Sequence, residues 1–434
     1  MGLSLIYDAT LIANVRGGKR TGTFFVADAL LKEFLRRDDI SLKIYCRSGD
    51  EKQARINLAP YLSKKNCEII FVKRHFFGVQ FRLFVKVVLR VLPKFLTTFL
   101  YSSAQKILAL KQNFFKNTEQ KSLDGNENCV FFSPFFAPPK EYLHLAKFLV
   151  IYDAIPLIFD EYRNNPGNYW FLELARKLDE SYTCFAISSY TKTDFLKHLP
   201  HLKPENIIVT PLACDERFKP ANADEIAKAR KKYNIPENKK YIFSLCTLEP
   251  RKNLLRTVKC FANFISKNNI DDLVFVLGGA HWDRFISILE NEIGSLDENI
   301  KSRILKIGYV DDSDQAALYS GALFFVYTSQ YEGFGLPPLE AMSCGTPVIT
   351  SNNSSLPEVV GNAGIMIDYD DDEAHIKAYE SYYYNENLRQ ENSKKGLERA
   401  KLFSWKKCAD IMITEMKKRV LIKNTQGEKQ NEED

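Results

Sequence analysis

Two glutamates flank a glycine-rich segment in the run Tyr331-Glu-Gly-Phe-Gly-Leu-Pro-Pro-Leu-Glu340. The glycines adopt backbone conformations that other residues avoid, and they let a ligand approach the main chain. The prolines fit the first turn of a helix, where N–H groups have no intrahelical partner. Free N–H groups at a helix start attract anions, whereas the carboxylates of Glu332 and Glu340 can accept hydrogen bonds from hydroxyl groups. The pattern therefore predicts a nucleotide-sugar site, with a diphosphate between two hydroxylated rings.

Two adjacent cations, Arg251 and Lys252, lie in a second motif, Thr247-Leu-Glu-Pro-Arg-Lys-Asn253. The motif follows a predicted strand, and the carboxyl ends of strands border the crevice in which open α/β sheets bind ligands. Two positive charges there can neutralise a diphosphate and the charge on a leaving nucleotide. A cationic pair in a loop is more often simply solvated. We favour the phosphate-binding role because the pair accompanies the first motif.

Both motifs require a scaffold of strands, and short β-branched and aromatic runs recur along the chain in two series. Most of these runs are almost continuously apolar, which is typical of parallel strands covered on both faces. Helix-length segments such as 24–37 and 253–267 alternate with them, so the sequence predicts an α/β fold with two sheets. The first series comprises 4–8, 42–46, 68–72, 129–133, 148–153, 183–188 and 207–211, and the second 240–246, 273–279, 303–308, 323–329, 347–351 and 364–368.

A polar stretch, 212–239, separates the two series. It contains two prolines and no strand pattern, which is typical of a connection between domains. The sequence therefore predicts an N-terminal domain at 1–211 and a C-terminal domain at 236–402. Residues 423–434 contain no large apolar side chain, and we expect them to form a disordered tail.

The net charge of +6 is unevenly distributed along the chain. Nine lysines and arginines and no acidic residue lie between Val72 and Thr118, so that stretch carries +9 and the rest of the chain −3. A protein that coats nucleic acid would spread its positive charge over a larger surface, so we expect no nucleic-acid partner. The charge along the chain therefore indicates a slightly acidic protein with one basic insert at about 73–117.

Cations recur at every fourth position in this insert, at Arg82, Lys86, Arg90 and Lys94. In a helix they would form one stripe, and apolar and aromatic residues fill most of the positions between them. The pattern is typical of a helix at a membrane surface, where each cation adds attraction to an anionic leaflet. The alternative is a core helix of the first domain whose cationic stripe meets water.

The remaining composition bears on cellular location. The nine cysteines include no C-x-x-C pair, and many lie in apolar runs, which indicates buried, reduced thiols. The start of the chain lacks the features of a secretory signal, and no uncharged apolar run reaches about 18 residues. We therefore expect a cytoplasmic protein, peripheral at the inner face of the cell membrane if the insert docks there.

The longest motif, from Glu332 to Ile349, resembles the E-x7-E segment of the retaining glycosyltransferases of family 4. That family has the GT-B fold, in which two Rossmann-like domains face each other across a cleft. The resemblance covers most of the chain, because further family segments follow in the same order. They are the Gly-containing loop 20–25, LEPRKN (248–253), LGGA (277–280), 308–322, 354–364 and the last helix at 403–416. The resemblance implies an acceptor-binding first domain, a nucleotide-sugar-binding second domain and a final helix, 403–420, that crosses back onto the first.

The resemblance also implies roles for individual residues. Lys252 would bind the donor phosphates, helped by Arg251, and Glu332 would contact the transferred sugar. Glu340 would hold the ribose hydroxyls, and Gly22 would let its loop approach the diphosphate and the acceptor. Main-chain amides for the sugar and phosphate would come from Gly333, Phe334, Gly335 and Leu336.

The chain departs from the family pattern at two positions. Thr247 stands where the family often has an arginine, five residues before Lys252. Tyr152-Asp153 stands where the family often has His-Asp, whose histidine faces the reacting sugar. A phenol can donate a hydrogen bond to a sugar hydroxyl, but it does not take up a proton at neutral pH as imidazole does. We keep Tyr152 and Asp153 as candidate site residues, although Asp153 is equally well explained as a cap of the following turn.

The resemblance thus implies a retaining transferase with a nucleotide-diphosphate sugar as donor and no further cofactor. Asp368-Tyr-Asp370 formally matches the metal-binding D-x-D of other glycosyltransferases, but we interpret it as a helix cap and predict metal-independent transfer. The expected donor sugar is a hexose of the mannose, rhamnose or glucose type. The expected acceptor is a glycan, either lipid-linked or a precursor of lipopolysaccharide or capsule. Alternatives are a non-catalytic nucleotide-sugar-binding scaffold and a nucleotide-sugar epimerase.

Overall fold

The computed structural model describes residues 2–15, 21–62, 67–73, 128–165, 168–280 and 283–433. The basic insert predicted at about 73–117 lies outside this part of the chain except for Lys73. The predicted membrane-facing residues Arg82, Lys86, Arg90 and Lys94 are therefore outside it too. Their interpretation stays a prediction.

In the described part of the chain, the first sheet has seven strands in the order β3-β2-β1-β4-β5-β6-β7. The pairs β1–β2, β1–β4, β2–β3 and β6–β7 are parallel. The strands are β1 (Leu3–Asp8), β2 (Ile40–Ser48), β3 (Glu68–Lys73), β4 (Cys129–Ser133), β5 (Ala146–Ile151), β6 (Tyr182–Ala186) and β7 (Ile207–Val209). The helices are α1 (Thr10–Ala13), α2 (Gly22–Leu35), α3 (Glu51–Leu58), α6 (Ile155–Ile158), α7 (Asp160–Arg163), α8 (Tyr169–Lys177) and α9 (Ser189–His198), with short 3-10 turns at Ala59–Tyr61, Lys140–Tyr142 and Pro204–Asn206.

The second sheet has six strands in the order β10-β9-β8-β11-β12-β13, and all its neighbouring pairs are parallel. The strands are β8 (Lys240–Leu245), β9 (Leu273–Gly278), β10 (Ile304–Gly308), β11 (Phe324–Tyr327), β12 (Val348–Ser351) and β13 (Gly364–Ile367). The helices are α10 (Ala223–Lys232), α11 (Leu254–Lys267), α12 (Asp283–Gly294), α13 (Glu298–Lys301), α14 (Gln315–Ser320), α15 (Leu336–Ser343), α16 (Leu356–Val360), α17 (Asp372–Tyr384) and α18 (Glu386–Ala400), with a 3-10 turn, η5, at Pro250–Lys252. Two parallel α/β sheets were predicted, and the structure confirms them.

The chain forms two compact units, Met1–Phe148 with Glu415–Asp434, and Leu149–Thr414. The boundary falls within β5, whereas the domains predicted at 1–211 and 236–402 divide the chain between the sheets. The predicted domain boundaries therefore stay a prediction. All of the candidate site residues discussed below lie in the second unit, except Gly22.

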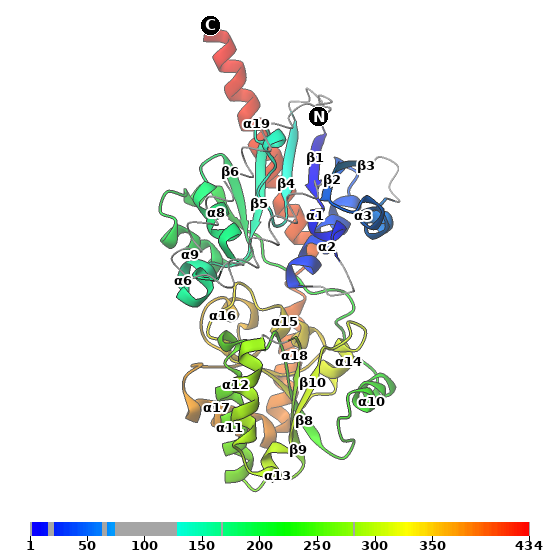
Figure 1. Ribbon diagram of the computed structural model, residues 1–434, viewed down its shortest axis with the longest axis vertical. Coiled ribbons are helices and arrows are strands. Elements are labelled where there is room, and N and C mark those ends of the chain that lie inside the picture. Colours follow the sequence, from blue (N-terminus) through cyan, green and yellow to red (C-terminus); the bar gives the residue numbers. More distant parts are fainter. Residues whose placement is uncertain are drawn as a thin grey trace, which may run out of the picture. The chain divides into compact units, whose positions relative to one another are not determined.

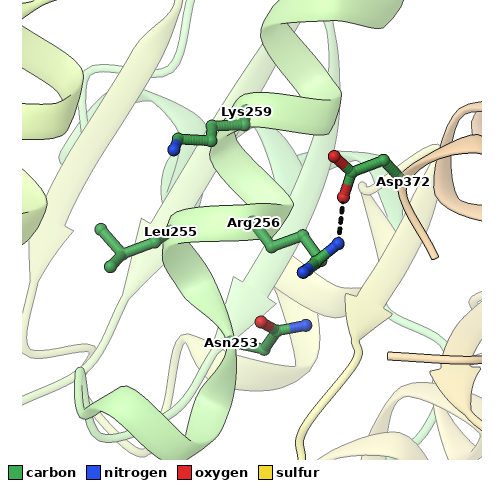
Figure 2. Close-up of a pocket in the computed structure, with 5 residues that line it drawn as sticks. All are labelled: Asn253, Leu255, Arg256, Lys259 and Asp372. Atoms are coloured by element: carbon green, nitrogen blue, oxygen red, sulfur yellow. Dashed lines mark hydrogen bonds and ion pairs between the residues drawn. The ribbon is translucent and has the colours of Figure 1, made fainter. Parts of the chain in front are cut away.

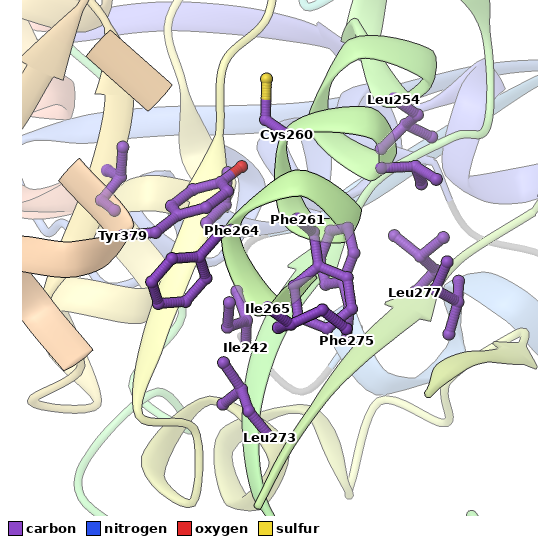
Figure 3. Close-up of a cluster of buried hydrophobic side chains, with 14 of the residues drawn as sticks. Ile242, Leu254, Cys260, Phe261, Phe264, Ile265, Leu273, Phe275, Leu277 and Tyr379 are labelled. Carbon is purple, nitrogen blue, oxygen red and sulfur yellow. The ribbon is translucent and has the colours of Figure 1, made fainter. Parts of the chain in front are cut away.

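Helix α11 anchors the core beside the second motif. Its buried residues recur three and four positions apart, which places them on one face. That face packs on the sheet through Phe261, whose ring lies 5.4 Å from that of Phe275, and on α17 through Phe264, whose ring lies 5.9 Å from that of Tyr379 (Figure 3). Helices α11 and α17 lie side by side (Figure 1). Because α11 begins two residues after Lys252, this packing fixes the turn that carries Lys252.

The last helix, α19 (Trp405–Glu433), is longer than predicted. It was expected to end at 420 and to be followed by a disordered tail at 423–434, and this was wrong because the helix continues to Glu433. The polar tail is rich in lysine, glutamine and glutamate, which have high helix propensity. Within the first unit, Lys417 forms an ion pair with Asp39 at 2.6 Å. Neither α19 nor any other helix in the described part of the chain is long and apolar enough to cross a membrane.

Candidate functional site

Lys252 and Glu332 meet at the carboxyl ends of β8 and β11. Nζ of Lys252 lies 2.6 Å from Oε1 of Glu332, and the same oxygen accepts a hydrogen bond from Nη1 of Arg251 at 3.0 Å. The side chains of Lys252, Arg251 and Glu332 are only 9–11% exposed. The structure thus brings together the charged residues that the two sequence motifs predicted to share a site.

Arg251 is held on several sides by protein groups. Its Nη2 donates to Oε1 of Glu249 at 2.5 Å, and its Nη1 also donates to the carbonyl of Tyr331. Glu249 is 6% exposed and accepts a further hydrogen bond from Tyr162 at 3.4 Å. The guanidinium therefore neutralises two buried carboxylates, and the phosphate-binding role that the sequence suggested for Arg251 stays a prediction.

The cations keep Glu332 ionised. Burial by itself would raise the pKa of this carboxyl group, but Arg251 and Lys252 outweigh burial and lower the pKa to about 2. A buried carboxylate with this pKa carries its negative charge throughout the neutral range. It can accept hydrogen bonds, as a residue that contacts sugar hydroxyls must.

Tyr327, at the end of β11, also holds Lys252. Its hydroxyl accepts a hydrogen bond from Nζ of Lys252 at 2.5 Å, and Nζ lies 4.9 Å from the centre of its ring. Burial raises the pKa of Tyr327, so the phenol stays neutral. Our sequence reasoning missed Tyr327 and Glu249. The available signal was their position, because both are polar groups close to the carboxyl ends of strands.

The glycine loop has the predicted order of strand, loop and helix. Gly335 has a φ of +115° at the N-cap of α15, and a Cβ atom there would lie 2.8 Å from Cδ2 of Leu356. Only glycine fits both conditions. Ser355 donates a hydrogen bond to the carbonyl of Glu332 at 2.9 Å and to that of Phe334 at 2.7 Å, so the loop is fastened on both sides of Gly333. Helix α15 begins at Leu336, so the two prolines lie in its first turn, as predicted.

Glu340 lies one turn into α15 and is half-buried. Its Oε2 accepts a hydrogen bond from the hydroxyl of Tyr319 at 2.9 Å. Burial raises the pKa of Glu340 to about 7, although the Tyr319 hydrogen bond opposes the shift. The two glutamates of the E-x7-E motif therefore differ, since one is fully ionised and the other titrates near neutrality.

Tyr152 and Asp153 lie directly against Gly333. A Cβ atom on Gly333 would lie 2.2 Å from the carbonyl oxygen of Tyr152 and 3.0 Å from Cβ of Asp153. Burial raises the pKa of Asp153, while Arg251 opposes the shift. Oδ1 of Asp153 also accepts a hydrogen bond from the amide of Ile155 at 3.0 Å, which is the capping role considered as its alternative.

Gly22 belongs to the other compact unit. It begins α2 after Thr21, whose hydroxyl caps the helix by accepting a hydrogen bond from the amide of Phe24 at 3.4 Å. A Cβ atom on Gly22 would meet nothing within 4 Å. The role that the family resemblance implies for Gly22 stays a prediction.

Among the described residues, no group of three or more His, Cys, Asp or Glu side chains is placed to hold a metal ion. The acidic turn that contains the D-x-D match precedes α17. The side chain that caps α17 is Asp371, which accepts a hydrogen bond from the amide of Ala374 at 2.9 Å. The predicted capping therefore comes from the residue that follows Asp370.

A shallow pocket of about 280 Å³ opens on α11 (Figure 2). An ion pair between Arg256 and Asp372 crosses it, and Asn253 Nδ2 donates to the carbonyl of Tyr369 at 2.6 Å. None of the lining residues is a predicted donor-site residue. They are Asn253, Leu255, Arg256, Lys259 and Asp372.

Comparison with known proteins finds a matching family model and several relatives. Residues 225–399 match the family model "Glycosyl transferases group 1". The chain is 32% identical over 249 residues to O-antigen chain mannosyltransferase B of Escherichia coli, covering 57% of this chain and 64% of the relative. It is 27% identical over 271 residues to the serotype-specific mannosyltransferase WbdA of Escherichia coli, covering 61% and 32%. The chain thus spans less than two thirds of either relative.

Solved structures match over nearly the whole chain. WaaG, a glycosyltransferase involved in lipopolysaccharide biosynthesis, is 14% identical with a TM-score of 0.61, covering 94% of this chain and 97% of WaaG. Anabaena HepE, solved in complex with UDP and glucose, is 14% identical with a TM-score of 0.63, covering 95% and 99%. The segment 225–399 thus matches the group 1 glycosyltransferases, and the two parallel α/β sheets of the chain are those of the GT-B fold.

Proposed function

We propose that the protein transfers a hexose from a nucleotide-diphosphate sugar to a hydroxyl group of a glycan acceptor. The observation that carries the proposal is the buried contact of Lys252 with the ionised Glu332, next to the glycine loop that starts α15. The cation serves the departing phosphate, and the carboxylate accepts hydrogen bonds from the transferred sugar. Glu340 holds the ribose at the far end of the loop and helix start.

Arg251 acts indirectly in this proposal. Its bonds to Glu249 and Glu332 favour a role in holding Glu332 charged and in place, so Lys252 and the amides of Gly333 to Leu336 serve the diphosphate. Tyr152 and Asp153 border the transferred sugar, because their backbone and Cβ atoms pack against Gly333.

We further propose that transfer retains the anomeric configuration and needs no metal ion. The bond between the anomeric carbon and the diphosphate oxygen breaks, and the acceptor oxygen bonds to the same face of that carbon. The departing phosphate takes the proton of the acceptor hydroxyl, so no protein nucleophile is required. Lys252 supplies a positive charge for the leaving group, which is the task of the metal in other transferases.

The names of the relatives support a mannose-type hexose and an acceptor of bacterial surface polysaccharide synthesis. Both relatives described above are mannosyltransferases, one of them named for the O-antigen chain, and WaaG is involved in lipopolysaccharide biosynthesis. Such acceptors are often carried on lipid, which agrees with the predicted membrane role of the basic insert. The full chain is expected to co-sediment with anionic vesicles, and less so in high salt. If the protein does not co-sediment with anionic vesicles at either low or high salt, the proposed contact of the basic insert with a membrane is wrong.

The test of the function is incubation of the protein with labelled GDP, UDP, dTDP and ADP sugars and a polysaccharide-precursor acceptor. Transfer is expected with at least one donor, and its rate should be the same with and without a chelator. Epimerisation of the donor, or binding without transfer, would overturn the proposal. Loss of transfer in chelator, restored by a divalent ion, would overturn metal independence.

A further inference from the structure

One face of α9 carries three polar residues at regular spacing. Ser188 is the N-cap of the helix, and Thr191 and Asp194 follow at intervals of three, which places them on the same side. Their exposed fractions are 1%, 0% and 7%. Buried polar side chains of this kind need hydrogen-bond partners.

The partners are the two residues on either side of Glu332. Ser188 Oγ donates to the carbonyl of Gly333 at 2.7 Å, and Thr191 Oγ1 lies within donating distance of the same carbonyl at 3.1 Å. Oδ2 of Asp194 accepts a hydrogen bond from the hydroxyl of Tyr331 at 2.6 Å. Tyr331 and Gly333, the residues before and after Glu332, are thus hydrogen-bonded to one face of α9. More than 130 positions separate this helix from the loop in sequence.

The start of α9 is itself fixed to Glu358, which lies in the family segment 354–364. Both carboxylate oxygens of Glu358 accept hydrogen bonds from the start of α9, from the amide of Ser189 at 2.8 Å and from that of Tyr190 at 2.7 Å. The ring of Tyr331 is 4% exposed and packs edge-on against Phe159, 5.9 Å between ring centres. The loop has little freedom to shift along α9.

Thr191 also connects this face to the other candidate residues. Its Oγ1 lies 3.0 Å from the carbonyl of Tyr152, and that carbonyl is the atom that a Cβ on Gly333 would meet. One hydroxyl therefore lies between the loop that carries Glu332 and the segment that carries Tyr152 and Asp153, and its single hydrogen can be donated to either carbonyl.

We infer that Ser188, Thr191 and Asp194 form a positioning face, which sets the carboxylate of Glu332 at the distance from Tyr152 and Asp153 that sugar transfer requires. The inference rests on the proposed function and adds to it residues that no site motif contains. Removal of one hydroxyl leaves a buried carbonyl short of a donor, and the loop adjusts. Small displacements of a reacting geometry reduce the rate of the chemical step far more than they reduce ligand affinity.

The test compares Thr191→Val with Thr193→Val. Both replace a hydroxyl with a methyl group on α9, but Thr193 is exposed and donates only within its own helix, to the carbonyl of Ser189 at 3.0 Å. For Thr191→Val we expect kcat to fall roughly tenfold, with the KM for the donor and the affinity for the free nucleoside diphosphate within about twofold. Thr193→Val should match the wild type in all three. Tyr331→Phe, which removes only the hydroxyl that binds Asp194, should lower kcat in the same manner.

The possible results are distinguishable. Equal kcat values for Thr191→Val, Thr193→Val and the wild type would overturn the positioning role and leave the transfer function intact. An equal loss of kcat and nucleotide affinity, with a lowered melting temperature, would indicate a merely structural role and would also overturn it. If the wild type transfers no sugar, the proposed function fails, and amide hydrogen exchange of 329–336 then decides the positioning role. Faster exchange in Thr191→Val than in Thr193→Val supports it, and equal exchange overturns it.

Discussion

Nζ of Lys252 lies 2.6 Å from Oε1 of Glu332, and both side chains are about one-tenth exposed. A cation and a carboxylate are thus presented together at a site where little water screens them. The arrangement holds Glu332 in its charged form, which is the state that a sugar hydroxyl would meet.

Replacing Lys252 with methionine is expected to remove the charge that meets the departing phosphate. We predict a fall in kcat/KM of roughly 100-fold, which is typical of the loss of one electrostatic group aimed at a developing charge. Lys259→Met is the matched control, because Lys259 is an exposed lysine on α11 that pairs with Glu292 at 3.4 Å. Steady-state kinetics of both variants check the prediction, and a Lys252→Met enzyme within threefold of the wild type would contradict it.

Replacing Arg251 with methionine is expected to destabilise the fold. Glu249 and Glu332 would lose the guanidinium that neutralises them in a buried setting, and breaking such a contact typically lowers the free energy of unfolding by about 3–5 kcal/mol. The control is Arg256→Met, since Arg256 pairs with Asp372 at the surface and should change stability by less than about 1 kcal/mol. Urea denaturation measures both, and equal losses would argue against the structural role of Arg251.

Because the pKa of Glu340 is raised, we predict that the free energy of unfolding depends on pH. Its pKa is about 7 in the folded protein and near 4.5 in the unfolded chain, so the folded state binds the proton more tightly. The resulting stabilisation is fully present below pH 4.5 and is lost as the pH rises through 7. Relative to Glu340→Gln, the free energy of unfolding of the wild type should therefore fall by roughly 3 kcal/mol between pH 4.5 and 8. A difference between the two proteins that does not vary with pH would contradict the buried setting of this carboxyl group.

Gly335 and Gly22 offer a matched pair of alanine substitutions. Gly335→Ala combines a φ of +115° with a 2.8 Å approach to Leu356, and we predict a loss of about 1–3 kcal/mol in the free energy of unfolding. Gly22→Ala places its methyl group in open space at the start of a helix and should leave stability unchanged or slightly improved. Thermal unfolding measures the stability of both variants. Similar melting temperatures would contradict the strained conformation of Gly335.

The sequence predicted the features that depend on local pattern. The apolar runs located both sheets, and the glycines and prolines between Glu332 and Glu340 located the loop and the start of α15. The meeting of Lys252 with Glu332 was also predictable, because both follow strands of one parallel sheet and the carboxyl ends of such strands share an edge.

Features that depend on distant pairing were not predictable. Arg251 binds Glu249 and the carbonyl of Tyr331, and nothing in a Lys/Arg pair indicates which cation makes these contacts. The role of Thr191 depends on a contact with Gly333, 142 positions away. Serine and threonine at a helix start are usually local caps, so the sequence offered no reason to link them to the loop.

The central claim is tested most directly by the anomeric configuration of the transferred sugar. The wild-type protein would be given a mannose-type nucleotide sugar and a polysaccharide-precursor acceptor, and the new linkage would be assigned by nuclear magnetic resonance. A retaining transferase gives a linkage with the same anomeric configuration as the donor. An inverted linkage would contradict retention, and no new linkage with any nucleotide sugar would contradict the transferase function itself.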